Sequence, residues 1–338
     1  MHLLVTGGAG FIGSNFIHYL LRTYQDVRIT NLDNLTYAGN LENLREAEND
    51  PRYEFVKADI AEAAQLEPVF ADRRFEAVVH FAAESHVDRS LHLGVEAFIR
   101  TNILGTQKLL DLTRAHRVPR FVHVSTDEVY GSLDDGGSFT ETSPIQPNNP
   151  YAATKAASDF LVRAAAKSYN LDAVTTRCSN NYGPYQFPEK LIPLMIANAM
   201  ENRPLPVYGD GQQVRDWIYV EDHCRGVDLA LRHGETGAVY NIGGMHDVPN
   251  LEVVQQILHL LNKPATLITH VPDRPGHDRR YAMDATRISE ELGWAPQFDF
   301  TAGLRRTVDW YLNNRAWWER IRSGAYRDYY QKIYQQRS

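Results

Sequence analysis

The feature that most constrains the fold is a run of glycines directly after the first hydrophobic segment. Residues 2–6 (HLLVT) are typical of a short buried strand, and residues 7–13 (GGAGFIG) lead into a helix-like stretch that reaches Leu21. Glycines at this spacing let the chain turn, let the backbone approach a pyrophosphate and let a helix pack closely on a strand. The helix N-terminus adds free N–H groups for phosphate. The start of the chain therefore predicts a dinucleotide-binding unit.

The next predicted strand, from Val27 to Leu32, ends at an acidic residue, Asp33, which lies 20 positions beyond Gly13. A carboxylate at this point binds both ribose hydroxyls and repels a 2′-phosphate, so we expect NAD rather than NADP as the cofactor. A further strand is followed by Asp59, which we expect to lie beside the adenine, to cap a helix, or to do both.

Predicted strands and helices alternate along the first half of the chain. Further strands are expected at 53–57, 77–81 and 171–176 and from Phe121, with helices at 96–117 and 151–169. This alternation predicts an α/β fold, a Rossmann-type doubly wound parallel sheet with right-handed crossovers. From about residue 184 the alternation loosens and Pro and Gly become frequent. We expect an NAD-binding domain at 1–183 and a smaller C-terminal α/β cap at 184–338 that mainly binds substrate, with some strands and helices returning to the first domain.

The segment from Phe121 to Lys155 carries the residues that point to catalysis. A hydrophobic strand ends in Ser-Thr-Asp-Glu at 125–128, where a parallel sheet binds its ligands. After a loop rich in Gly, Pro and Asn come Tyr151 and Lys155, which share one face of a helix. A lysine ammonium beside a phenol lowers the tyrosine pKa, so Tyr151 is expected to act as a base. The alternative interpretation is a solvated strand end followed by an ordinary exposed helix.

Cationic and aromatic side chains in the second half suit a diphosphate and a base. Arg215 lies among aromatic residues, and Arg274 and His277 lie in a polar loop at 273–280. Guanidinium groups match phosphate oxygens with paired donors. Tyr208 is placed to stack on a nucleobase. The alternative for the two arginines is surface salt bridges and a solvated turn.

Composition excludes several classes of protein. Net charge is −7 over 338 residues, which argues against a broad nucleic-acid surface. The two cysteines, Cys178 and Cys224, lack the spacing of a disulfide framework or a metal site, and we expect no metal. The N-terminus does not resemble a signal peptide, and apolar runs are too short for a membrane span. We expect a cytoplasmic enzyme with no membrane or nucleic-acid partner.

Eight motifs carry a family resemblance over nearly the whole chain: TGGAGFIG, LDNLTYAGN, AAESHVDRS, STDEVYG, YAATK, CSNNYGPYQFPEKLIP, RDWIYVEDH and DRPGHDRRYAMD. Together they resemble the extended short-chain dehydrogenase/reductase superfamily and, within it, the dTDP-glucose 4,6-dehydratases. The resemblance implies a tightly held NAD, a homodimer packed through helices, and conversion of dTDP-glucose to dTDP-4-keto-6-deoxyglucose and water. It also implies transient oxidation at carbon 4, elimination across carbons 5 and 6, and hydride return to carbon 6. The product would be a precursor for deoxysugar synthesis, and rhamnose is the deoxysugar that we expect.

The resemblance assigns site residues as follows. The catalytic residues are Thr126, Asp127, Glu128, Tyr151 and Lys155. The cofactor residues are Gly7, Gly10, Phe11, Ile12, Gly13, Asp33, Asn34, Leu35, Thr36, Asp59, Ile60, Phe81, Ala82, Ala83, Ser85, Thr101, Tyr151, Lys155 and Asn181. The substrate residues are Ser85, Thr126, Asn180, Lys190, Leu191, Pro206, Val207, Tyr208, Arg215, Asn250, Asp273, Arg274 and His277.

Within this assignment Tyr151, as a phenolate whose pKa is lowered by Lys155 and by the oxidised nicotinamide, takes the proton of the 4-hydroxyl, which Thr126 orients. Glu128 removes the proton of carbon 5, and a protonated Asp127 protonates the departing 6-hydroxyl. The alternatives are a sugar-nucleotide 4-epimerase, which has no use for the two acids, a 4,6-dehydratase for another NDP-glucose, and a non-catalytic NAD-sensing protein. The sequence leaves the nucleotide base and the downstream pathway open.

Overall fold

The computed structural model describes residues 1–92, 94–133, 136–273 and 276–323. Among these residues, seven parallel strands form the central sheet in the order β10-β6-β5-β4-β1-β2-β3. The strands are β1 (His2–Thr6), β2 (Arg28–Asp33), β3 (Tyr53–Lys57), β4 (Ala77–His80), β5 (Arg120–Thr126), β6 (Ala173–Cys178) and β10 (Val239–Ile242). The predicted α/β class and doubly wound parallel sheet are confirmed.

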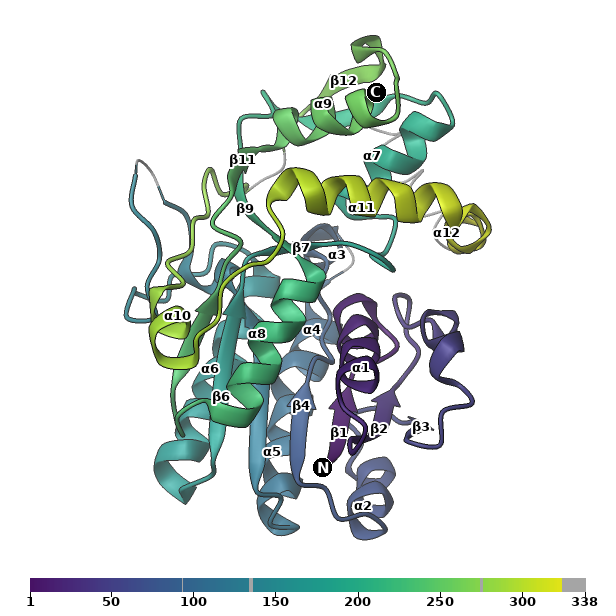
Figure 1. The fold of residues 1–338 in the computed structure, drawn as a ribbon. Helices are drawn as coiled ribbons and strands as arrows, with labels where there is room; N and C mark the ends of the chain where they lie inside the picture. Colours follow the sequence, from purple (N-terminus) through teal and green to yellow (C-terminus); the bar gives the residue numbers. More distant parts are fainter. Residues whose placement is uncertain (93, 134–135, 274–275, 324–338) are drawn as a thin grey trace.

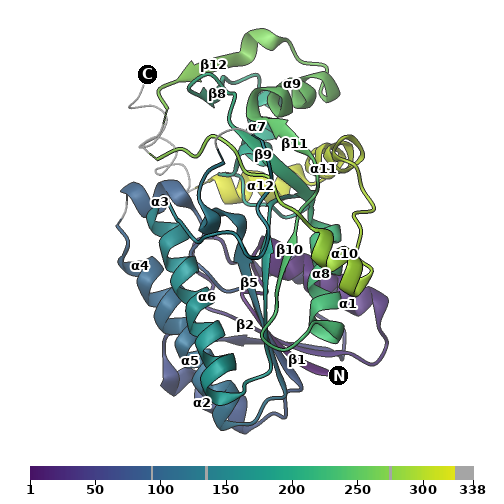
Figure 2. The same ribbon diagram turned by 90° about the vertical axis from the view of Figure 1, so that its left-hand side faces the viewer.

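Helices cover both faces of this sheet (Figures 1 and 2). One face carries α1 (Phe11–Thr23) and α8 (Val220–His233), and the other carries α2 (Ala63–Ala71), α5 (Thr106–Ala115) and α6 (Pro150–Tyr169). Alternating side chains of β1 explain this arrangement, because Leu3 and Val5 pack in the core under α1 while Leu4 packs in the core under α5. Both faces are apolar, as a parallel sheet requires.

The direction of winding reverses beside β1. From β1 the chain builds outward through β2 and β3, and then crosses back to β4 on the other side of β1. A reversal of this kind leaves a crevice at the carboxyl ends of the strands, and open α/β sheets bind their ligands there. These ends point toward the cap in Figure 1.

The cap is a separate cluster of short strands and helices above the carboxyl ends (Figure 1). Its strands are β7 (Asn180–Tyr182), β9 (Val214–Tyr219) and β11 (Asp247–Pro249) in one sheet, and β8 (Leu205–Tyr208) and β12 (Ile268–Val271) in another. Its helices are α7 (Leu191–Met200), α9 (Asn250–Leu260), α11 (Phe300–Asn313) and α12 (Arg315–Arg322). Its core combines aliphatic side chains with aromatic ones, which include Tyr182, Trp217 and Trp318.

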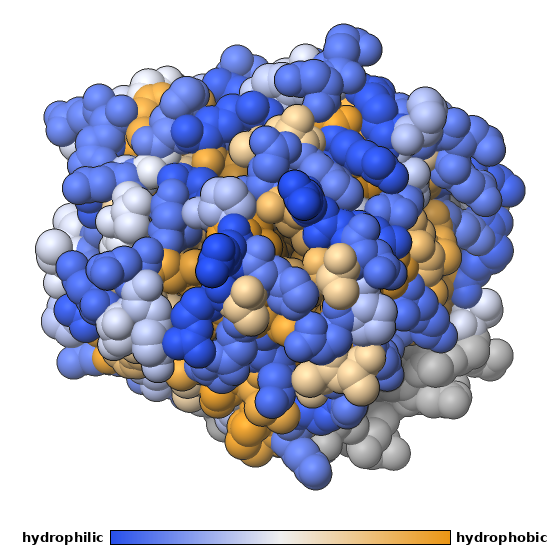
Figure 3. Space-filling view, turned by 90° about the horizontal axis from the view of Figure 1, so that it is seen from below, coloured by the Kyte–Doolittle hydropathy of each residue, from blue (hydrophilic) through white to orange (hydrophobic). Residues whose placement is uncertain are grey.

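Two elements of the second half return to the central sheet. β10 pairs with β6 at the sheet edge, and α8 packs in the same core as α1. Seen from the end of the sheet opposite the cap, the surface is mainly hydrophilic with small separate apolar areas (Figure 3). In the described part of the chain, no helix is long and apolar enough to cross a membrane.

The helix predicted at 96–117 is not uniform. It comprises α4 (Glu96–Phe98), a π-helical segment at Ile99–Gly105, and α5. Asn102, within the π segment, donates to Glu84 O (3.0 Å) and to Thr154 Oγ1 (2.9 Å). Widened turns of this kind occur often at functional sites, and here Thr101 lines a pocket described below.

Candidate active site

The glycine-rich turn is held so closely that side chains do not fit. Gly7 has φ +72°, and a Cβ there would lie 2.5 Å from Ala82 N; a Cβ on Gly13 would lie 2.4 Å from Gly7 O. Helix α1 then begins at Phe11 with Gly10 as its N-cap, and no described side chain caps it. The helix end therefore keeps its N–H groups and positive dipole for an anion, which suits a pyrophosphate.

Asp33 at the end of β2 is fixed by backbone donors. Ala9 N–H donates to its Oδ2 (3.0 Å) and Leu35 N–H donates to its Oδ1 (2.8 Å). Burial raises the pKa of Asp33 above its ordinary value, and these two hydrogen bonds offset only part of that increase. Asp59 accepts from Ala61 N–H (2.8 Å) and pairs with Arg100 (2.5 Å), so it stabilises the turn after β3. Asp33 and Asp59 both line the pocket described below.

The acid pair lies at the carboxyl end of β5. Thr126 ends the strand, donates to Asp127 Oδ1 (3.2 Å) and accepts from Glu128 N–H (3.3 Å), so one side chain orients the whole turn. Burial raises the pKa of Asp127 well above its ordinary value, and the neighbouring Glu128 carboxylate and Asp216 raise it further. These effects favour the protonated form of Asp127, which is the direction that the sequence predicted.

Tyr151 and Lys155 lie one turn apart on α6, but the predicted pKa shift of Tyr151 is wrong for the protein groups alone. Burial, followed by the charge of Glu128, raises the pKa of Tyr151, and a hydrogen bond with Thr126 opposes these effects. The Lys155 ammonium donates to Val124 O (2.9 Å), and burial lowers its pKa to about 8. The sequence spacing placed the pair correctly, but burial was not visible in it.

A network of buried charged side chains next to Lys155 stabilises its charged form. Asp159, one turn further along α6, accepts from Arg177 Nε (2.8 Å), and His123 Nε2 lies 3.3 Å from its other oxygen. Arg177 also donates to Tyr130 Oη (2.8 Å). The Asp159 carboxylate raises the pKa of Lys155 against the effect of burial, and its own pKa falls to about 2. Asp159 therefore helps to keep the lysine charged.

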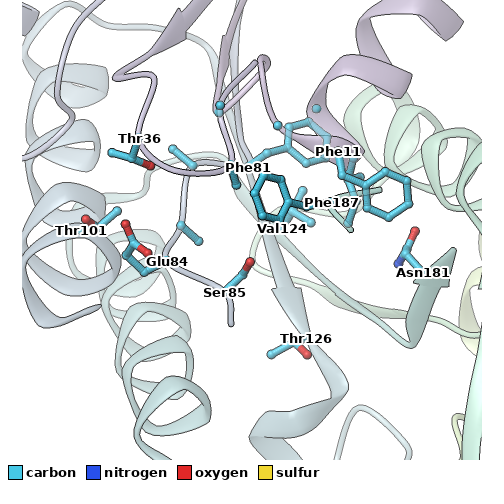
Figure 4. Close-up of a pocket in the computed structure, with 18 of the residues that line it drawn as sticks. Phe11, Thr36, Phe81, Glu84, Ser85, Thr101, Val124, Thr126, Asn181 and Phe187 are labelled. Carbon is cyan, nitrogen blue, oxygen red and sulfur yellow. The ribbon is translucent and has the colours of Figure 1, made fainter. Parts of the chain in front are cut away.

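Most of the predicted cofactor and catalytic residues line one pocket at this edge of the sheet. Figure 4 shows Thr36 and Thr101 on one side of it, Asn181 on the other, and Thr126 below. Its lining includes Gly7, Gly10, Phe11, Ile12, Gly13, Asp33, Asn34, Thr36, Asp59, Ile60, Phe81, Ala82, Ala83, Ser85, Thr101, Thr126, Asp127, Glu128, Tyr151, Lys155, Asn180, Asn181 and Lys190. Leu35 lies outside the lining and contributes its backbone N–H to Asp33.

The other predicted substrate residues lie in the cap and do not line this pocket. Arg215 is buried, donates to Val214 O (2.8 Å) and Asp278 O (2.9 Å), and lies over the Tyr281 ring. His277 Nδ1 lies 2.6 Å from Asp273 Oδ1. The remaining residues of this group are Leu191 at the start of α7, Pro206, Val207 and Tyr208 on β8, and Asn250 at the start of α9. Arg274 lies outside the described residues.

Sequence reasoning missed several pocket-lining residues, among them Tyr37, Gln186 and Phe187, and two side chains that connect segments around the pocket. Asn149 caps α6 by accepting from Ala152 N–H (2.8 Å) and donates to Glu128 Oε2 (3.0 Å), which links the acid pair to the catalytic helix. The Asn-Pro dipeptide before the helix was a capping signal that could have found it. Arg89, over the Tyr37 ring and paired with the buried Glu189, joins three segments around the pocket, and no local pattern announces that contact.

The doubly wound sheet, the glycine-rich turn and the Tyr-x-x-x-Lys pair at one pocket define an enzyme of the extended short-chain dehydrogenase/reductase class. A family model described as GDP-mannose 4,6 dehydratase matches residues 4–307. A dTDP-glucose 4,6-dehydratase from Neisseria meningitidis serogroup B is 53% identical, with 96% of this chain and 97% of that protein covered. The enzyme of that name from Salmonella typhimurium is 49% identical over all of both chains. The chain belongs to the GDP-mannose 4,6 dehydratase family.

Solved structures agree with this assignment. A dTDP-glucose 4,6-dehydratase from Streptomyces venezuelae, DesIV with NAD and TYD bound, superposes with a TM-score of 0.92 at 52% identity, covering 95% of this chain and 100% of that one. A UDP-glucose 4-epimerase from Thermus thermophilus in complex with NAD superposes with a TM-score of 0.86 at 31% identity, covering 93% and 100%. The fold is therefore shared by enzymes of both names.

The close packing of Gly7 gives a first prediction. In Gly7→Ala the alanine must adopt a positive φ, and its Cβ must also displace Ala82. In Gly237→Ala the alanine must adopt a similar φ of +78°, but its Cβ meets no described atom within 4 Å. We expect Gly237→Ala to lower the free energy of unfolding by about 1 kcal/mol, and Gly7→Ala by about 1–3 kcal/mol more. Urea denaturation of both variants measures the difference, and equal losses would show that the turn is not tightly packed.

The network under Lys155 gives a second prediction. Asp159→Asn leaves the buried Arg177 without its carboxylate, and we expect a loss of about 3–5 kcal/mol in the free energy of unfolding. Asp172→Asn removes the partner of Arg120 at a more exposed position and should cost less than about 1 kcal/mol. Urea denaturation of the two variants tests this, and similar losses would contradict a special role for Asp159.

Proposed function

We propose that this chain is an NAD-dependent dTDP-glucose 4,6-dehydratase, a hydro-lyase that converts dTDP-glucose to dTDP-4-keto-6-deoxyglucose and water. The observation that carries the proposal is the pair of neighbouring acids, Asp127 and Glu128, in the same pocket as Tyr151 and Lys155. The relatives named for this activity are about half identical along nearly their whole length. The product is a precursor of deoxysugars.

The pocket fits NAD. Asp33 is held rigidly where a ribose diol would bind, and the uncapped end of α1 lies where a pyrophosphate would bind. The absence of room for a side chain at Gly7 and Gly13 brings the backbone close to such a ligand. When bound, oxidised NAD supplies a positive nicotinamide that takes a hydride from carbon 4 of the hexose and returns it to carbon 6.

Tyr151 and Thr126 would act on the 4-hydroxyl. Protein groups alone keep Tyr151 as a neutral phenol, so a positive charge bound in the pocket is what would lower its pKa toward the working range of a base. Burial lowers the pKa of Lys155 to about 8, and its ammonium, one turn away on α6, would act in the same direction. Thr126, which hydrogen-bonds within the turn, would orient the hydroxyl for proton transfer to Tyr151.

Asp127 and Glu128 would carry out the elimination. A ketone at carbon 4 makes the carbon 5 proton acidic, and Glu128, half-buried and held by Asn149, would remove it. Asp127 is kept protonated by burial and by its neighbour, so it can give a proton to the departing 6-hydroxyl. Two adjacent carboxyls with different surroundings thus divide the work of acid and base.

This acid pair also favours a dehydratase over a 4-epimerase. The fold does not separate the two activities, since the Thermus thermophilus epimerase shares it. An epimerase returns the hydride to carbon 4 and needs no acid to expel a hydroxyl. A buried Asp127 whose pKa is raised well above its ordinary value, beside Glu128, would have a role in the elimination and none in epimerisation.

The diphosphate and base would lie in the cap. Arg215 has a fixed guanidinium between two carbonyl oxygens and an aromatic ring, and Lys190 donates to Ser85 O (3.0 Å) at the edge of the pocket. His277 and Tyr208 lie edge to face, with ring centroids 6.0 Å apart. These four side chains, with Asn180, are the proposed contacts of the sugar nucleotide.

We also propose a cytoplasmic homodimer that associates through the helices on the α5 and α6 face. Three large apolar side chains are exposed there: Ile99 at 47%, Leu104 at 44% and Phe160 at 53%. The π segment at 99–105 and α6 are neighbours in the fold, so these residues lie on adjacent helical surfaces. Burial of such a face between two copies of the chain would remove it from water.

Isosteric removal of the acid tests the mechanism. With Asp127→Asn, hydride transfer can proceed but expulsion of the 6-hydroxyl lacks its proton donor, so we expect turnover to fall about 100-fold or more. Absorbance at 340 nm should show reduced cofactor accumulating on the enzyme during turnover of dTDP-glucose. Tyr151→Phe is the matched control, because it should block the 340 nm signal as well. Unchanged turnover of Asp127→Asn would remove that residue from the mechanism.

The activity itself is tested with a series of nucleotide sugars. Initial rates with dTDP-, UDP-, CDP- and GDP-glucose, read by a carbonyl-sensitive assay, should be highest for dTDP-glucose. Formation of a 4-epimer with no keto product would establish the epimerase instead. Preference for another nucleotide would keep the reaction and change the substrate.

The oligomeric state is tested with a charged substitution on the exposed face. Phe160→Glu should shift the protein from dimer to monomer, because a carboxylate at the centre of an apolar interface loses its hydration. Met245→Glu alters an equally exposed apolar residue in the cap (58%) and should leave the dimer intact. Light scattering after size exclusion measures both, and a wild-type monomer would overturn the proposal.

A further inference from the structure

Asn43, in the 3₁₀ segment Leu41–Ala47, is a buried residue that holds the glycine-rich turn. Its Nδ2 donates to Ala9 O (3.0 Å), and the same oxygen accepts from Asn40 N–H (2.9 Å). Ala9 N–H in turn donates to Asp33 Oδ2 (3.0 Å). Ala9 is thus the link between Asn43 and the carboxylate that faces the proposed ribose site.

The remaining end of the Asn43 amide is held by the cap. Trp317 on α12 donates its Nε1–H to Asn43 Oδ1 (3.0 Å), across 274 positions of sequence. Its ring packs edge to face against Tyr185 and Trp310 in the aromatic core of the cap. At the surface Arg320 of α12 pairs with Glu42. Figure 1 shows α12 at the end of α11, on the side of the molecule where β2 and β3 lie.

We infer that α12 is part of the cofactor-binding machinery: Trp317 positions Asn43, and Asn43 positions the glycine-rich turn and Asp33 for NAD. The chain of hydrogen bonds runs without a gap from Trp317 through Asn43 and Ala9 to Asp33. The inference rests on the proposed use of NAD. Trp317 and Asn43 are positioning residues in this account, since they act through Ala9 and do not line the pocket.

Burial makes the loss of either hydrogen bond of the Asn43 amide costly. Asn43 is 2% exposed and Trp317 is 7% exposed, so neither amide end of Asn43 finds water if its partner is removed. A buried acceptor left without a donor is costly, and the amide is free to turn over once one end is released. Loss of the Trp317 donor or rotation of the Asn43 amide would move Asn43 Nδ2 away from Ala9 O. The turn would then sample other positions, and NAD would have to order it on binding.

Thermodynamic linkage gives a reciprocal consequence. If docking of α12 strengthens NAD binding, then NAD binding strengthens docking of α12 by the same factor. The helix lies outside the pocket, so a change in its protection on NAD binding reports the coupling without reference to turnover.

Two neighbouring tryptophans provide a matched experiment. Trp317→Phe removes the N–H donor to Asn43 and keeps an aromatic ring, while Trp318→Phe removes an N–H donor to Tyr311 O (3.1 Å) within the cap itself. We expect calorimetric titration of NAD into cofactor-stripped full-length protein to show a Kd about five- to tenfold higher for Trp317→Phe, the lower part of the range of typical coupling between sites. Trp318→Phe should bind NAD as the wild type does.

A second variant keeps the test decisive if Trp317→Phe folds poorly. Asn43→Ala should also weaken NAD binding. The double variant Trp317→Phe/Asn43→Ala should bind NAD with the same Kd as Asn43→Ala alone, because both substitutions break the same series of hydrogen bonds. Hydrogen exchange of residues 315–322 should slow on adding NAD to the wild type and to Trp318→Phe, and change little in Asn43→Ala.

The outcomes separate this inference from the proposed function. Wild-type protein that does not bind NAD would overturn both. Wild-type binding with an unchanged Kd in folded Trp317→Phe, or additive effects of the two substitutions, would overturn the role of α12 alone and leave the proposed activity standing.

Discussion

Burial at the carboxyl end of β5 is the constraint on which the site depends. It is the largest cause of the pKa shifts of Asp127, Tyr151 and Lys155, and it acts against the charged form of each. The protein therefore favours the protonated form of the acid and of the phenol, and it lowers the stability of the lysine ammonium. The same desolvation makes any charge that a ligand adds here act strongly on its neighbours.

Burial on this scale requires partners that lie outside the pocket. Lys155 donates to a backbone oxygen of β5, the Asp159 carboxylate raises its pKa against burial, and Asp159 in turn accepts from Arg177 on β6. The catalytic helix, two neighbouring strands and the turn after β5 are thus connected through side chains that touch no ligand. Because all these elements belong to one parallel sheet and its covering helix, the sheet sets the relative positions of acid, phenol and lysine.

The sequence predicted those features that depend on neighbours along the chain. The glycine spacing, Asp33 after β2, and the Tyr151–Lys155 spacing each follow from local geometry, and the parallel sheet follows from their alternation. It did not predict the direction of the Tyr151 shift, which depends on burial by distant segments. Nor did it predict Asn149 beside Glu128, the Asp159–Arg177 pair or the π segment, because each depends on residues brought together by the fold. The roles of the cap residues remain predictions.

The hydrogen bond between Trp317 and Asn43 also has a meaning for how the chain is made. Its two ends are separated by 274 positions. At ordinary rates of translation this interval lasts roughly a quarter of a minute to a minute. The first strands and the glycine-rich turn leave the ribosome that much earlier than the helix that secures them. The nascent amino-terminal half must therefore wait, with Asn43 hydrated rather than bonded to indole, until the codon of Trp317 has been read.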